Sequence, residues 1–114
     1  MDAFHGDIPV TRLLSAEEVE KNYEQSTGKV IIECFDSQKK PIEMPAVLAA
    51  GHGPFTWGKD ALESVKNALI LEEVAKIAHG TLLLTSGQQS TLPLYIQDKH
   101  FFRKHGVGSY YGQN

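Results

Sequence analysis

The sequence predicts one domain of the α/β or α+β class, built from three helices and two to four strands. Its 114 residues are 41% hydrophobic and 22% charged, which is the balance of a folded globular domain rather than a disordered chain. Apolar residues recur at helical spacing after position 60, whereas short β-branched or small apolar runs follow positions 28 and 45. Both kinds of element are therefore expected in the same small domain.

The first helix is predicted over about residues 16–24. Ser15 and Glu18 have the spacing of a capping box, in which each side chain satisfies a backbone N–H of the first turn. We expect this helix to stop before Thr27 and Gly28. The next run, residues 29–35, is apolar and β-branched, so it predicts a strand.

A second strand is predicted over residues 46–50, where small apolar residues that suit the centre of a sheet follow Pro45. Residues 51–58 contain three glycines and one proline, and this composition predicts an irregular loop. Asp60, with Glu63 three positions later, predicts the cap of the longest helix.

That longest helix is expected over about residues 60–78, with Gly80 as its stop. A last helix is predicted to start near Thr91, with Pro93 in its first turn and Gly106 as its end. These two helices would complete the domain.

Composition excludes several functional classes. A formal net charge of −3 argues against nucleic acid or an anionic membrane as the main partner. The single cysteine, Cys34, can form no internal disulfide and no thiolate zinc site, which indicates a reducing compartment. The chain has neither an apolar run of membrane-spanning length nor a signal peptide, so a cytoplasmic location is expected. Because apolar and turn-forming residues such as Phe4 and Gly6 come almost at once, the chain is expected to begin inside a domain.

His52 is the first candidate for chemistry. It follows a predicted strand and lies between Gly51 and Gly53, so little steric cover is expected over its ring. The alternative is an ordinary loop histidine bonded to the backbone. A catalytic zinc site typically has three protein ligands, and the chain contains no His-x-His or His-Glu-x-x-His motif, so His52 cannot form a metal centre alone.

Four potential cations in the segment 98–105 are the second candidate. Lys99, His100, Arg103 and Lys104 fall on adjacent helical faces and could bind a phosphate. The alternative is that they complement the negative end of the helix dipole.

The tyrosine pair near the C-terminus is the third candidate. Tyr110 and Tyr111 lie between glycines, and a tyrosine hydroxyl can act as a general acid or base when a neighbouring cation lowers its pKa. Alternatively, both rings anchor the tail or fill an interface.

The order of these motifs is specific. The chain contains Gly51-His-Gly-Pro-Phe-Thr-Trp-Gly-Lys59, Asp98-Lys-His-Phe-Phe-Arg-Lys-His-Gly106 and Tyr110-Tyr-Gly-Gln113. Together with residues 2–12, 27–33 and 71–76, these motifs resemble the epimerases of the class II aldolase/adducin-like family. The resemblance covers essentially all of this chain, but only the C-terminal half of the family's domain.

The resemblance implies a fold and an assembly. The family fold is a three-layer α/β/α sandwich on a mostly antiparallel sheet, so residues 1–114 are expected to form the C-terminal half of such a domain. The family assembles as a homotetramer with its sites between subunits. Part of the sheet and of the helix 60–78 is therefore expected to lie uncovered, so that the chain self-associates or pairs with a missing N-terminal half.

The resemblance also implies roles for four residues. His52 matches the third histidine ligand of a catalytic zinc ion, one of three ligands in the family. Asp2 falls where the family has its catalytic aspartate, and Tyr111 matches an opposing acid/base that comes from the neighbouring subunit. His100 matches a histidine near the substrate at the same interface.

The implied reaction is metal-dependent epimerisation at C4 of a pentulose 5-phosphate, from L-ribulose 5-phosphate to D-xylulose 5-phosphate, by retro-aldol and aldol steps. The family's His-x-His metal pair and its phosphate-binding segments have no counterpart here, so the isolated chain is expected to be inactive. One alternative is a non-catalytic remnant or assembly module of the same fold. Another is a related class II sugar-phosphate aldolase, although the tyrosine-containing tail favours the epimerase.

Overall fold

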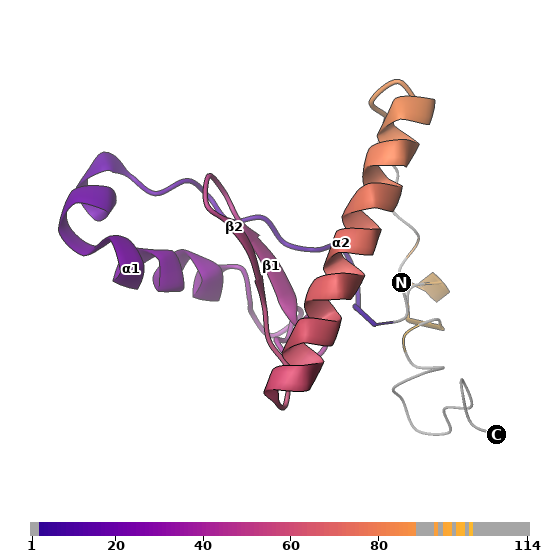
Figure 1. Cartoon of the computed structure of the whole chain (residues 1–114), viewed down its shortest axis with the longest axis horizontal. Helices are drawn as coiled ribbons and strands as arrows, with labels where there is room; N and C mark the ends of the chain where they lie inside the picture. Colours follow the sequence, from indigo (N-terminus) through magenta and orange to yellow (C-terminus); the bar gives the residue numbers. More distant parts are fainter. Residues whose placement is uncertain (1–2, 89–92, 94, 97, 100, 102–114) are drawn as a thin grey trace.

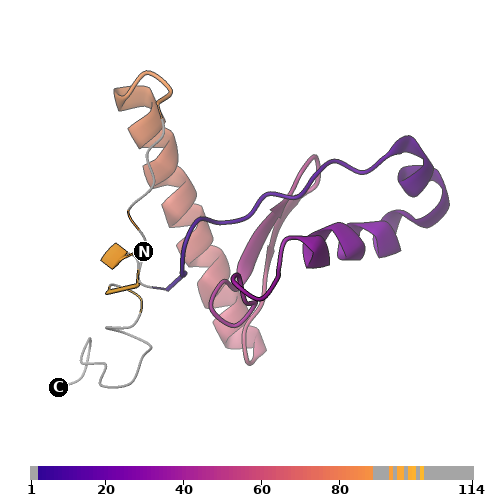
Figure 2. The same cartoon turned by 180° about the vertical axis from the view of Figure 1, so that it is seen from behind.

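The computed structural model describes residues 3–88, 93, 95, 96, 98, 99 and 101. Within them the elements follow in the order α1 (Ala16–Glu33), β1 (Ala46–Ala49), β2 (Gly53–Thr56) and α2 (Ala61–Leu84). The two strands lie between the two helices, as both views show (Figures 1 and 2). The predicted class is confirmed as α+β with an antiparallel sheet. The three-layer sandwich stays a prediction.

Strands β1 and β2 form an antiparallel hairpin, in register from Ala46 opposite Thr56 to Ala49 opposite Gly53. The prediction of an irregular loop over residues 51–58 is therefore wrong for Gly53–Thr56. Pro54 has no N–H to donate, and it is tolerated because β2 has no second strand beside it in the described sheet.

The other edge of β1 is also hydrogen-bonded, which agrees with the prediction that its small apolar residues suit the centre of a sheet. Leu48 donates its N–H to the Pro9 carbonyl oxygen at 2.9 Å and accepts from the Thr11 N–H at 2.9 Å. This forms an isolated parallel bridge between Val10 and Leu48. The extended segment before α1 thus runs alongside the hairpin (Figure 1).

Helix α1 begins as predicted, because the capping box of Ser15 and Glu18 is present in both directions. The predicted end before Thr27 and the predicted strand over residues 29–35 are wrong, since the helix continues to Glu33 with a kink at Asn22. Val30 explains the continuation: it is 2% exposed as part of α1, a helix that contacts β1, and this burial outweighs a weak β-propensity.

Helix α2 also begins as predicted, with the Asp60 carboxylate accepting from the Glu63 N–H at 2.8 Å. Its predicted end is wrong, because the helix passes through Gly80 and ends at Leu84. A glycine inside a helix costs only about 1 kcal/mol relative to alanine, which the surrounding helical residues offset. Asn67 attaches α2 to the hairpin by donating to the Trp57 carbonyl oxygen at 2.7 Å.

The core lies where α2, the hairpin and the N-terminal segment meet. Its buried cluster consists of Phe4, Met44, Ala46 and Leu71. Residues 95, 96, 98, 99 and 101 have helical backbone, which agrees with a last helix, and Phe101 is buried. The predicted limits of that helix, at Thr91 and Gly106, lie outside the described residues.

One face of α2 carries large apolar side chains that lie in water. Leu62 is 80% exposed and Leu69 is 66% exposed, as the expectation of an uncovered helix face requires. Neither described helix combines the length and the apolar character that crossing a bilayer would need.

Candidate functional site

His52 lies at the tip of the hairpin, in the turn that joins β1 to β2, as its place after a predicted strand indicated. Its N–H donates to the Ala49 carbonyl oxygen at 2.9 Å, which closes the turn. Gly51 has a φ of 74°, a left-handed conformation that favours glycine. Gly51 thus allows the backbone to make this turn, and the His52 side chain is exposed.

Two aromatic rings flank the His52 imidazole. The ring of Phe55, on β2, lies 5.2 Å from it between centroids, and the ring of Tyr23, on α1, lies 6.1 Å away in a stacked arrangement. The imidazole thus has an aromatic neighbour from each of two elements, and the His52 side chain stays exposed. Both neighbours were missed from the sequence, because Tyr23 is far from His52 along the chain and Phe55 was expected in a loop.

A small cavity opens beside this histidine, between α1, the segment before it and the hairpin turn. It has a volume of about 150 Å³, and Thr11, Tyr23, Thr27 and His52 are among its lining residues. Small-molecule sites usually enclose roughly 300–1,000 Å³. The cavity is therefore too small to be a complete small-molecule site, and it could form one part of a larger one.

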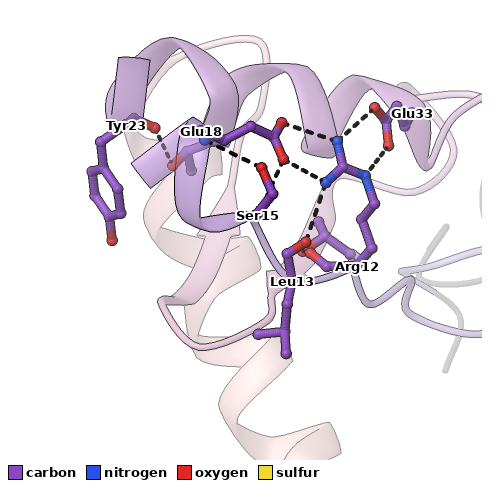
Figure 3. A network of polar contacts seen from close by, with 8 residues as sticks. Arg12, Leu13, Ser15, Glu18, Tyr23 and Glu33 are labelled. Atoms are coloured by element: carbon purple, nitrogen blue, oxygen red, sulfur yellow. Dashed lines mark hydrogen bonds and ion pairs between the residues drawn. The ribbon is translucent and has the colours of Figure 1, made fainter. Parts of the chain in front are cut away.

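An ionic network around Arg12, which lines the cavity, joins the segment before α1 to that helix (Figure 3). The Arg12 guanidinium donates from Nη1 to Glu18 Oε1 at 2.8 Å and from Nε to Glu33 Oε2 at 3.1 Å. The hydrogen bonds to Arg12 and to the Ser15 N–H lower the pKa of Glu18 to about 2, and the two carboxylates raise the pKa of Arg12. Since two carboxylates neutralise Arg12, it holds the cavity wall in place rather than offering a free charge to a phosphate.

Cys34 is a free thiol at the end of α1. Burial, and then the nearby charge of Glu33, raise the pKa of Cys34. The thiolate form is therefore scarce near neutral pH, and this cysteine is a poor nucleophile or metal ligand.

A metal site needs several donors close together. Within the part of the chain that the structure describes, no group of three or more His, Cys, Asp or Glu side chains is placed to hold a metal ion. Imidazole is a good zinc ligand, so His52 fits the role of one ligand, but the described residues do not complete a zinc site around it.

The other three predicted site residues, Asp2, His100 and Tyr111, lie outside the described residues, so their roles stay predictions. Of the four predicted cations in segment 98–105, Lys99 is described and is exposed. Asp98, just before it, contacts His5 from the N-terminal segment. No local pattern could have revealed this pair, because its members are 93 positions apart.

The chain is similar to a known family model and to curated proteins. A family model described as the Class II Aldolase and Adducin N-terminal domain matches residues 1–79. The chain is 48% identical over 112 residues to "L-ribulose-5-phosphate 4-epimerase UlaF" of Salmonella paratyphi A (strain ATCC 9150 / SARB42), covering 98% of this chain and 48% of that protein. It is 50% identical over 115 aligned positions to the protein of the same name from Salmonella choleraesuis (strain SC-B67), again covering 98% of this chain and 48% of the relative. The chain thus spans about half the length of the curated relatives it matches.

Proposed function

Since the chain belongs to the class II aldolase and adducin family, we propose that it forms part of a sugar-phosphate epimerase that inverts C4 of a pentulose 5-phosphate. The substrate pair would be L-ribulose 5-phosphate and D-xylulose 5-phosphate, in the cytoplasm. The observation that carries this proposal is the near-complete alignment of the chain with proteins named L-ribulose-5-phosphate 4-epimerase.

The chemistry of the substrate determines the route. The hydrogen on C4 of a 2-ketopentose is not alpha to the carbonyl, so removing it would give no stabilised carbanion. Breaking the C3–C4 bond instead leaves its electron pair in an enediolate of carbons 1–3, while the C4 hydroxyl loses its proton and becomes the aldehyde of glycolaldehyde phosphate. The aldehyde turns, C3 attacks its opposite face, and the new C4 alkoxide takes up a proton, so the stereochemistry at C4 is inverted.

This route needs one proton donor or acceptor on each face of the aldehyde. We assign these roles to Asp2 and Tyr111, with Tyr111 coming from a neighbouring subunit. His100 would contact the substrate at the same interface. The assignments rest on the match between this sequence and the family motifs.

His52 would be one ligand of a divalent metal ion, which we propose to be zinc. When bound, such an ion stabilises negative charge that develops on substrate oxygens. The hairpin supports this role, because the imidazole lies at an exposed turn, next to the rings of Phe55 and Tyr23. The remaining ligands would come from outside the described residues.

We further propose that the active form is an assembly. The sandwich would be completed by a homotetramer, as in the family, or by a polypeptide equivalent to the family's N-terminal half. The exposed apolar face of α2 and the small cavity beside His52 both support a site completed by other chain segments.

The test is turnover of L-ribulose 5-phosphate by the purified chain, alone and mixed with a polypeptide equivalent to the family's N-terminal half, with zinc present. We expect D-xylulose 5-phosphate from the mixture and little from the chain alone. His52→Ala should lower the rate in the mixture at least about 100-fold, whereas the exposed α2 residue His79→Ala should leave it unchanged. A mixture that releases glycolaldehyde phosphate without forming the epimer would indicate a related aldolase instead.

A second candidate function is a non-catalytic assembly module of the same fold. The exposed apolar side chains of α2 favour it, because fully burying each one is worth about 1.5–3 kcal/mol. Light scattering of the purified chain is expected to show self-association that Leu62→Glu with Leu69→Glu abolishes. A monodisperse species of 12.6 kDa with protected amides throughout the hairpin would contradict this expectation.

A further inference from the structure

Thr11 is a buried polar residue that the proposed reaction leaves without a role. It lies in the extended segment before α1 and is 6% exposed. Its N–H donates to the Leu48 carbonyl oxygen at 2.9 Å, so its backbone is already held against β1. The hydroxyl is therefore not needed to pair this segment with the strand.

The Thr11 hydroxyl joins the segment to the hairpin turn. Its Oγ1 accepts from the Ala50 N–H at 3.0 Å and donates to the Arg12 carbonyl oxygen at 2.9 Å. A threonine hydroxyl has one proton to donate, and the Arg12 carbonyl oxygen takes it, so Oγ1 meets Ala50 as an acceptor. The two hydrogen bonds thus give the hydroxyl a defined direction.

Ala50 belongs to the turn that carries His52. The turn is closed by the His52 N–H, which donates to the Ala49 carbonyl oxygen at 2.9 Å, and the positive φ of Gly51 is at its third position. This closing hydrogen bond uses no group of Ala50, and the Ala50 N–H takes its acceptor from Thr11 instead. The hydroxyl therefore holds the backbone two residues before His52.

The other side of Thr11 is attached to α1. The Arg12 guanidinium pairs with Glu18 at 2.8 Å and with Glu33 at 3.1 Å, and both carboxylates belong to that helix. Since the Thr11 hydroxyl bonds to the Arg12 backbone, polar contacts run without a break from α1 to the hairpin turn. Thr11 and His52 also line the same small cavity.

We propose that Thr11 is a positioning residue, whose hydroxyl holds the turn bearing His52 in place relative to α1. Its relevance to metal binding and catalysis rests on the proposed function. Small displacements of reacting groups can cost large factors in rate, so a turn held in this way would favour a productive site.

Amide exchange tests the attachment without requiring turnover. Thr11→Val keeps the branched shape but removes the hydroxyl, and it should speed exchange at the Ala50 N–H about tenfold, because this partly buried group loses its acceptor. Thr11→Ser keeps a hydroxyl, so its Ala50 amide should exchange as in the wild type. Wild-type exchange at Ala50 in Thr11→Val would overturn the proposal.

Thr27→Val is the matched control. Thr27 is also buried and lines the same cavity, but its hydroxyl donates to the Tyr23 carbonyl oxygen at 2.8 Å, within α1. The same change of side chain there should leave exchange at Ala50 unchanged, and the amides of α2 should stay protected in every variant. If Thr11→Val lowers protection in α2, Thr11→Ala, which removes the hydroxyl without putting a methyl group in its place, carries the test.

Nuclear Overhauser contacts test the position of His52 itself. Its ring lies 6.1 Å from the Tyr23 ring of α1 and 5.2 Å from the Phe55 ring of β2, between centroids. In Thr11→Val the contact with Tyr23, which spans two elements, should be lost, whereas the contact with Phe55, within the hairpin, should remain. Thr11→Ser and Thr27→Val should keep both contacts.

The two proposals fail in different ways. If the Tyr23 contact persists in Thr11→Val, the hydroxyl has a merely structural role and the positioning proposal is refuted. Neither the exchange rates nor the ring contacts use epimerase activity, so an inactive mixture would contradict the proposed function alone.

Discussion

Val30→Ala and Ile32→Ala are expected to have very different effects on stability, because residues 29–33 are helical. In a strand, positions 30 and 32 would point to the same face, but in α1 they diverge by about 200°. Val30 is 2% exposed and Ile32 is 72% exposed. The two substitutions therefore separate a helix from a strand at this place.

The magnitude follows from burial. Val30→Ala removes two buried methyl groups, worth about 0.8 kcal/mol each on transfer, and the cavity left behind brings the loss in the free energy of unfolding to about 2 kcal/mol. Ile32→Ala removes carbon atoms that are already in water, and alanine is the better helix former, so the change should stay within about 0.5 kcal/mol.

Urea unfolding followed by circular dichroism measures both values. For a chain of this size, the larger loss corresponds to a fall in Tm of roughly 8–12 °C. Equal losses for the two variants would refute the helical assignment of residues 29–33 and restore the strand. A negligible loss for Val30→Ala would show that α1 does not pack on the sheet through this side chain.

Three further outcomes are expected. Calorimetric titration of the isolated chain with zinc should show no tight one-to-one binding that depends on His52, because one imidazole is too few ligands; tight binding lost in His52→Ala would contradict this. The pKa of Glu18 is lowered from 4.5 to about 2 by Arg12, so the stability that this pair contributes is present above pH 5 and is lost as the pH falls toward 2. The Tm of Glu18→Gln should accordingly depend less on pH in that range than the wild-type Tm. The same dependence of Tm on pH in both proteins would show that the Arg12–Glu18 pair does not stabilise the fold. Gly51→Ala should lower Tm because its φ is 74°, whereas Gly80→Ala, inside α2 with nothing within 4 Å of the added carbon, should raise it; effects of the same sign would show that backbone conformation does not decide these positions.

The helix starts could be predicted because capping is local. Ser15 with Glu18, and Asp60 with Glu63, form their hydrogen bonds within four residues of sequence, so the pattern alone contains the interaction. The helix ends could not be predicted in this way. Gly80 was expected to end α2. Whether a helix continues past a glycine depends on the free energy of the whole helix rather than on that one residue.

Contacts with other elements explain why two predictions of strand and loop were wrong. Residues 29–35 have the composition of a strand, and they are helical through Glu33 because Val30 finds its burial as part of α1. Gly53–Thr56 has the composition of a loop, and it is a strand because β1 supplies a partner for its backbone. In both places a packing or pairing partner, rather than the composition of the segment itself, determines the structure.

In the candidate site, too, local features could be predicted and contacts between elements could not. The position of His52 could be predicted, because a histidine between glycines after a strand is a local signal. Its surroundings could not, since Tyr23 and the wall held by Arg12 come from the segment before the hairpin. The hairpin is braced on one edge by the segment at Val10 and on one face by α2, so the described chain fixes where the imidazole stands before any ligand binds. We propose that His52 is one metal ligand, and one imidazole is too few donors for a metal site. Assembly, rather than the local structure of the hairpin, is therefore expected to control the proposed activity.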